Sequence, residues 1–231
     1  MGANDLLKYL SRILTMLLVL PLHEAAHGFV AKKMGDDTAE IQGRITLNPF
    51  AHLDPIGSLL MLFTGFGWAK PVPVNPIRMK RYRAGFALTA LAGPLSNLLA
   101  AFVSGLACNL LYCSRTVAEQ YNMYIYNGTI TPISCIMTIL SFLFSINIGL
   151  AVFNLIPLPP LDGFNVLRYF TSNKVDRWFY MHQREISYIF LIVILVITRL
   201  PAQYNFLYLI TDGLSDILWK AVSWIPEVRW G

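Results

Sequence analysis

Residues 13–31 read ILTMLLVLPLHEAAHGFVA, and this stretch decides the fold of the chain. It is 19 residues long and apolar apart from one threonine and the HEAAH sequence. A helix needs about 20 mostly apolar residues to cross the hydrocarbon of a bilayer. We therefore expect a membrane-spanning helix, followed directly by the basic pair Lys32 and Lys33.

The composition of the whole chain also indicates a membrane protein. Of its 231 residues, 55% are hydrophobic and only 13% are charged, and the mean hydropathy is +0.53. Soluble domains usually carry about 25% charged residues. The composition excludes a disordered chain, a disulfide scaffold and a nucleic-acid-binding tail, and it argues against a free soluble enzyme. We expect a lipid bilayer as a partner and no nucleic acid.

Further apolar stretches predict the remaining helices, at 84–112, 132–155, 186–200 and 206–224. The last could instead be an interfacial amphipathic helix. The stretch 56–69 has only 14 residues and suits a re-entrant segment. The sequence thus predicts an all-α polytopic membrane protein with a bundle of about 4–6 transmembrane helices and a re-entrant segment.

Two polar segments predict a short β element on the cytoplasmic face. Residues 39–47 alternate in hydrophobicity, and the prolines of 70–76 favour an extended chain. The basic residues set the orientation: residues 32–83 hold eight, 114–131 hold one and 164–185 hold four. By the positive-inside rule the first and third segments are cytoplasmic, which requires that 56–69 does not cross.

The HEAAH sequence at residues 23–27 has the spacing H-E-x-x-H. Side chains four apart on a helix lie about 40° apart around its axis and about 6 Å along it. Two imidazoles so placed can bind one Zn²⁺, and Glu24 can take a proton from water at the metal. The alternative is a polar helix end that holds two histidines by chance. Polar groups are costly at this depth of a membrane, which favours a function.

A zinc site of this kind needs a third protein ligand. Outside the first helix the candidates are His52, Asp54, Asp162 and His182. Asp162 lies in LPPLDG (158–163), which breaks the helix at the cytoplasmic end of the third span. The charge pattern brings the end of the first span to the same face, which favours Asp162. A turn that caps a helix is its alternative role.

In combination, these motifs resemble the site-2 proteases, the intramembrane zinc metalloproteases of peptidase family M50. The pattern N-x-x-P-x-x-x-L-D-G at 154–163 accompanies HEAAH. The sequences LNPFAHLDPIG (47–57), KPVPVN (70–75) and AGPLSN (92–97) are similar to the compact bacterial and archaeal branch of the family, which has no PDZ domain. The resemblance covers about residues 13–170.

The resemblance implies a function and a set of site residues. His23, His27 and Asp162 would bind one Zn²⁺ per chain, and Glu24 would be the general base. The enzyme would cleave transmembrane segments of other membrane proteins. Its active site would lie toward the cytoplasmic side of a bacterial or archaeal cell membrane.

Other polar residues in or near the spans have more than one interpretation. Asn97 and Asn154 could hold the substrate backbone or stabilise an oxyanion, or they could form hydrogen bonds between helices. His52 could be a transient ligand, orient another ligand or pack within its loop. The extended segment Lys70–Asn75 could hold an unwound substrate by edge pairing.

The two alternatives to a protease are a divalent-metal transporter and a membrane adaptor without proteolytic activity. A divalent-metal transporter would need further His, Asp or Glu along its path, and the spans 84–112 and 132–155 contain none. A proteolytically inactive membrane adaptor would not need Glu24. We expect one membrane-embedded metalloprotease domain over 1–231, with a catalytic core at about 13–170 and C-terminal helices at 186–224, in an unspecified oligomeric state.

Overall fold

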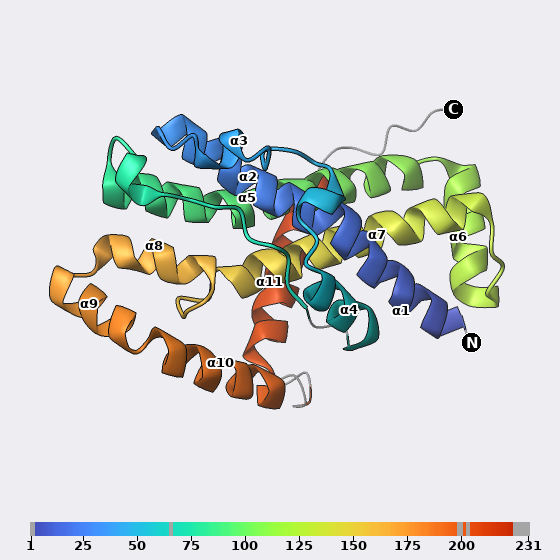
Figure 1. The fold of residues 1–231 in the computed structure, drawn as a ribbon. Helices are drawn as coiled ribbons and strands as arrows, with labels where there is room; N and C mark the ends of the chain where they lie inside the picture. The colour runs from blue at the N-terminus through green and yellow to red at the C-terminus, as the bar shows by residue number, and fades with distance from the viewer. Residues whose placement is uncertain (1–2, 65–66, 198–200, 202–203, 224–231) are drawn as a thin grey trace.

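The computed structural model describes residues 3–64, 67–197, 201 and 204–223, and this part of the chain is mostly helical (Figure 1). In chain order its elements are α1 (Ala3–Leu14), the π-helix η1 (Thr15–Val19), α2 (Leu20–Met34), α3 (Thr38–Ile41), the 3₁₀ turn η2 (Pro49–Ala51), α4 (Pro55–Thr64), the 3₁₀ turn η3 (Pro76–Arg78), α5 (Tyr82–Tyr112), α6 (Arg115–Asn127), α7 (Pro132–Asn154), α8 (Asp162–Phe170), α9 (Asn173–Met181), α10 (Gln183–Ile197) and α11 (Phe206–Ser223).

Three helical stretches are long and apolar enough to cross a membrane: Tyr9–Met34, α5 and α7. The first joins the second half of α1 to η1 and α2, and the π-helical turn lies just before Pro21, which has no N–H to donate. Each stretch begins and ends within a few residues of a predicted span. The prediction of a helical membrane protein is therefore confirmed.

The α5 helix is the centre of the bundle, because α2 packs on one side of it and α7 on another (Figure 1). The α11 helix crosses behind α5 and α7 and packs against both of them. The core between them combines residues of α5 and α7 with leucines of α11: Ala101, Phe144, Ile148, Val152, Leu207, Leu214 and Leu218.

The α10 and α11 helices correspond to the two remaining predicted spans. Neither is among the described helices that are long and apolar enough to cross a membrane. The described part of α10 has 15 residues, and residues 198–200 of its predicted span lie outside the described part of the chain. A bundle of 4–6 transmembrane helices thus stays a prediction.

The segment predicted to be re-entrant folds back on itself. Leu53 and Ala69 form an antiparallel bridge, and the Lys70 N–H donates to the His52 carbonyl over 2.7 Å. The two ends of the segment are therefore neighbours, with α4 between them. Ten helical residues are about 15 Å long, too short to cross a bilayer. This is the geometry expected of a segment that enters and leaves on one side.

The predicted β element is wrong for the described residues, which contain this one isolated bridge and no strand. Within 39–47, residues up to Ile41 continue α3, and turns follow. Gly35 ends α2 with a φ of 105°, and Asp36 then accepts hydrogen bonds from Thr38 that favour a helical start. Residues 70–75 are extended, as predicted, but pair with no strand, and Pro76 begins η3.

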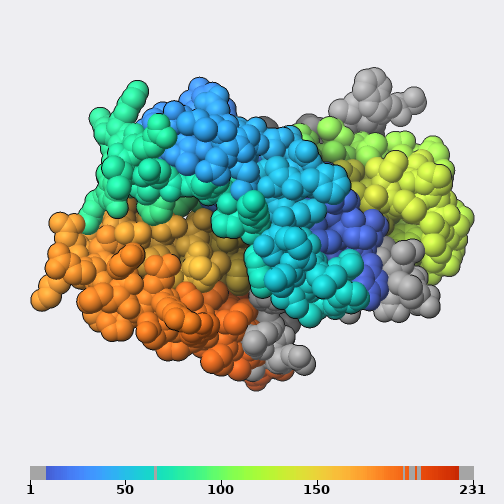
Figure 2. Space-filling view, in the orientation of Figure 1, coloured from blue at the N-terminus to red at the C-terminus, as the bar shows by residue number. Residues whose placement is uncertain are grey.

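Two segments that adjoin the long helices contain further helices. The segment 114–131 contains α6, which lies across the end of the bundle (Figure 1). After α7, the chain turns at the LPPLDG sequence into α8 and then α9 and α10, which form an arm beside the bundle. The described residues between about 36 and 80, namely 36–64 and 67–80, cover the face between α2 and this arm (Figure 2).

Candidate metal site and its cavity

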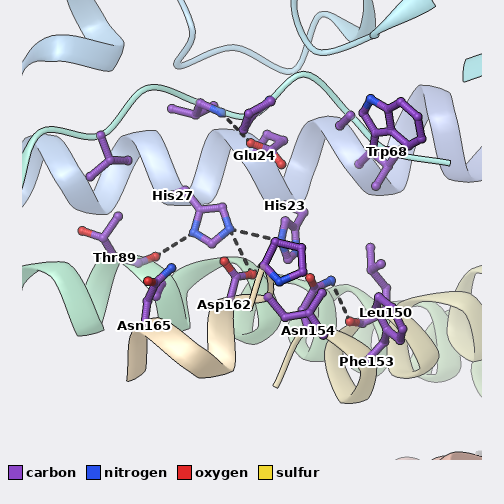
Figure 3. Close-up of a pocket in the computed structure, with 18 of the residues that line it drawn as sticks. His23, Glu24, His27, Trp68, Thr89, Leu150, Phe153, Asn154, Asp162 and Asn165 are labelled. Carbon is purple, nitrogen blue, oxygen red and sulfur yellow. Dashed lines mark hydrogen bonds and ion pairs between the residues drawn. The ribbon is translucent and has the colours of Figure 1, made fainter. Parts of the chain in front are cut away.

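Two histidines and an aspartate from distant parts of the chain meet beside α2 (Figure 3). His23 and His27 lie one turn apart on α2, and their Nε2 atoms are 3.1 Å from each other. Asp162, at the start of α8, places Oδ2 at 3.1 Å from His23 Nε2 and 3.3 Å from His27 Nε2. Both imidazoles are buried. The structure thus brings together the three residues predicted to be ligands.

The spacing of these three atoms fits a metal ion. Ligand atoms about 2.0–2.1 Å from a tetrahedral zinc ion stand about 3.3 Å from one another. The three distances between His23 Nε2, His27 Nε2 and Asp162 Oδ2 are 3.1, 3.1 and 3.3 Å, which agree with this value within about 0.2 Å. Two imidazoles and one carboxylate are a donor set that zinc accepts. His23, His27 and Asp162 could therefore hold one zinc ion.

Partners on the far side of each imidazole turn Nε2 toward the site. His27 Nδ1 donates to the Thr89 carbonyl over 2.7 Å, so the proton of this ring lies on Nδ1. His23 Nδ1 contacts Asn97 Oδ1, whose own Nδ2 donates to Asn147 over 2.7 Å. Each ring then presents an unprotonated Nε2, which is the form that binds a metal.

Gly93 on α5 leaves the space that this site needs. A Cβ at Gly93 would meet His27 Nε2 and would lie 2.5 Å from His23 Cε1 and 2.6 Å from His23 Nε2. No carbon atom can stand so close to a non-bonded atom of a ring without displacing it. The AGPLSN sequence therefore lets α5 approach the metal-binding atoms of α2.

Glu24 faces a different side of α2 from the two histidines (Figure 3). Its Oε2 accepts a hydrogen bond of 2.8 Å from the Val72 N–H. Val72 belongs to residues 70–75, which we call the strap because they run extended across the site. Glu24 and the three candidate ligands all line one cavity of about 600 Å³.

The strap is fixed to the protein at both ends. The Lys70 carbonyl accepts from Arg44 over 2.6 Å, and the Asn75 N–H donates to Asp36 over 2.6 Å. Asp36 is fully buried. Burial alone would raise its pKa, but hydrogen bonds from Thr38 and Asn75 outweigh this and hold the pKa below its usual range. The ionised Asp36 is thus a structural anchor for the strap.

The other predicted site residues lie in three different environments. Asn154 lines the cavity, and its Nδ2 donates to the Leu150 carbonyl over 3.0 Å. Asn97 does not line the cavity: it is fully buried and contacts the Nδ1 atom of the candidate ligand His23. His52 is also outside the cavity, and its Nε2 donates to the Thr46 carbonyl within its loop. This placement fits the packing interpretation of His52.

Sequence reasoning missed several residues of the cavity, among them Trp68, Thr89 and Asn165. Asn165 follows Asp162 by one helical turn, a spacing that could have identified it. Thr89 acts through its main-chain carbonyl, which no side-chain pattern reveals. Trp68 reaches the cavity only because the re-entrant segment folds back toward α2.

Comparisons with known proteins agree with the geometry. The sequence profile described as "Peptidase family M50" matches residues 11–198. "Putative zinc metalloprotease YwhC" of Bacillus subtilis is 37% identical over 214 residues, which cover 93% of this chain and 91% of that protein. "Putative zinc metalloprotease Rip2" of Mycobacterium tuberculosis is 31% identical over 157 residues, which cover 65% of this chain and 53% of that protein. No solved structure gives a significant match. The chain therefore belongs to peptidase family M50.

Proposed function

We propose that this protein is a zinc endopeptidase that cleaves transmembrane segments of other membrane proteins, in the manner of a site-2 protease. The observation that carries the proposal is one cavity lined both by the three candidate metal ligands and by the carboxylate of Glu24. Two of the ligands and the carboxylate belong to a helix that is long and apolar enough to cross a membrane. Family membership supports metalloprotease chemistry.

The chemistry divides between the metal and Glu24. Zinc held by His23, His27 and Asp162 would polarise a peptide carbonyl and make water more acidic. Glu24 would take a proton from the attacking water and return it to the leaving amine. The hydrogen bond from Val72 holds Oε2, and Oε1 makes no hydrogen bond within the described residues. One carboxylate oxygen is thus available for proton transfer.

Asn154 and the strap would position the substrate. One amide hydrogen of Asn154 is used by Leu150, which leaves the other hydrogen and Oδ1 to meet a peptide group in the cavity. Pro71 and Pro73 have no N–H, so the strap offers mainly carbonyl oxygens. A substrate that is unwound to an extended form could donate its N–H groups to these carbonyls.

The charge pattern supports a site toward the cytoplasmic side of the membrane. Lys32 and Lys33 end α2 about one turn after His27, and the strap is followed by a basic cluster (Arg78, Lys80, Arg81 and Arg83). Basic residues favour cytoplasmic loops. We place the site near this face, in a multi-pass membrane protein of a bacterial or archaeal cell membrane.

Co-reconstitution with a model single-span substrate tests the function. The parent protein should cleave the substrate, and a chelator should stop cleavage until zinc is restored. Glu24→Gln should keep its zinc and lose about 10²–10⁴-fold in rate, because the base is absent. Glu185→Gln, the same change at an exposed position on α10, is the control and should cleave normally. Full activity of zinc-loaded Glu24→Gln would overturn the proposal.

A further inference from the structure

The cavity around the candidate metal site has two unlike ends (Figure 3). Thr89 and Asn165 lie at the end toward the last turn of α2. Trp68, Leu150 and Phe153 lie at the other end, toward the start of α2, and we call these three residues the apolar end. The metal-binding side chains lie between the two, so a polypeptide that crosses the site must pass both.

The close approach of the two sides of the re-entrant segment fixes Trp68 at the apolar end. A Cβ on Gly57 would lie 2.9 Å from Trp68 Cδ1, and a Cβ on Gly67 would overlap the Gly57 carbonyl oxygen. Only glycine at both positions allows the two sides of the segment to approach so closely. The bridge between Leu53 and Ala69 closes the segment at the strap. The indole therefore has a defined place beside the cavity.

The opposite wall of the apolar end is supported from behind by α10. The rings of Phe153 and Phe190 pack with centroids 6.0 Å apart. Phe190 and Ile194 are buried against Leu161, the residue before the candidate ligand Asp162. This wall is thus a packed layer of side chains and not a loose surface.

With the orientation proposed above, the apolar end would lie deeper in the membrane than the end that holds Thr89 and Asn165. The α2 helix runs from the apolar end to Lys32 and Lys33, whose charges favour the aqueous interface. A substrate lying along the strap would therefore place its more deeply buried residues against Trp68. The walls at that end match the apolar side chains of a transmembrane segment.

We infer that the apolar end is a specificity pocket, which binds a large apolar side chain next to the scissile bond on the side toward the bilayer interior. The inference rests on the proposed function and deepens it. The cavity volume of about 600 Å³ is in the range of sites that enclose a ligand. Even one methylene group in an apolar pocket changes kcat/KM by about 10–200-fold.

A set of four single-span substrates tests this inference. Mass spectrometry of the products first locates the scissile bond, and the neighbouring residue on the bilayer side is then set to Ala, Leu, Phe or Asp. We expect kcat/KM for Leu and Phe to exceed that for Ala by about tenfold or more, with Asp lowest. Trp68→Ala should shift the preference toward Phe, and Leu150→Trp should shift it toward Ala.

The matched control is Phe63→Ala, which removes an aromatic ring from the same re-entrant segment. Phe63 is 65% exposed and does not line the cavity, so the order of the four substrates should be unchanged. A purely structural role of Trp68 would lower all four rates equally and would leave their order intact. That result, or equal rates for the four substrates with the parent protein, would overturn the inference.

Binding separates a failure of this inference from a failure of the proposed function. The affinities of the same four substrates for zinc-loaded Glu24→Gln protein should follow the order Phe and Leu above Ala, with Asp weakest. If zinc removal and Glu24→Gln leave cleavage of the substrates unchanged, the proposed function is wrong, and the binding order still decides whether the pocket is selective. Equal affinities would overturn the inference.

Discussion

The replacement of Gly93 by alanine gives the sharpest test of the metal site, because the added methyl group points directly at both imidazoles. A Cβ at this position would lie 2.5 Å from His23 Cε1 and 2.6 Å from His23 Nε2, and it would also meet His27 Nε2. Ordinary contacts of this kind begin at 3.4 Å. The rings or α5 must therefore move by about 1 Å.

The magnitude follows from the tolerance of a zinc site. Ligand distances in such sites hold within about 0.2 Å, so a shift of about 1 Å removes at least one ligand from its place. Loss of a supporting contact alone costs about 10–100-fold in metal affinity. We expect Gly93→Ala to weaken zinc binding by about 100-fold or more, which is about 2.7 kcal/mol.

Competition with a fluorescent zinc chelator measures this change in detergent-solubilised protein. Gly149→Ala on α7 is the matched control, because a Cβ there would meet no atom within 4 Å. It should bind zinc like the parent. Circular dichroism checks that both variants stay helical. If Gly93→Ala folds normally and binds zinc as tightly as the parent, the proposed arrangement of the ligands is wrong.

Three further predictions concern the partners of the site. Asn97→Leu removes the acceptor at His23 Nδ1 and should weaken zinc binding about 10–100-fold in the same competition assay; an unchanged affinity would remove Asn97 from the site. Asp36→Asn should lower the free energy of unfolding by about 1–3 kcal/mol at pH 7. The pKa of Asp36 in the folded protein is below its ordinary 3.8. The stabilisation is therefore fully present above pH 3.8 and is lost as the pH falls through the lower folded pKa. The thermal unfolding temperatures of the parent and the variant should then converge in acid. Zinc removal should lower the unfolding temperature of the parent but not of Asp162→Ala, since a ligand stabilises only the fold that binds it.

The sequence was most informative where a chemical pattern and a membrane coincided. HEAAH and LPPLDG are motifs of costly polar residues in apolar surroundings, so their side chains could be singled out before their positions were known. The length of 56–69 and the charge count around it predicted a segment that returns to its own side. The Leu53–Ala69 bridge shows the closed ends that this prediction requires.

The remaining features depend on how helices cross, which no local pattern contains. Asn97 meets His23 only because α5 lies against α2, and the glycine that allows this is one of several in the chain. The alternation at 39–47 resembled a strand, yet Asp36 and the glycine turn before it start a helix instead. The α6 helix was missed because Arg115–Asn127 is polar and lies in a connection between spans.

The central claim is that one zinc ion bound by His23, His27 and Asp162 supports peptide-bond cleavage in the membrane. Its most direct test measures zinc content and cleavage of a single-span substrate on the same proteoliposomes, for the parent and for Asp162→Ala. We expect one zinc per parent chain with cleavage, and loss of both in Asp162→Ala. A variant that keeps one tightly bound zinc and full cleavage would contradict it.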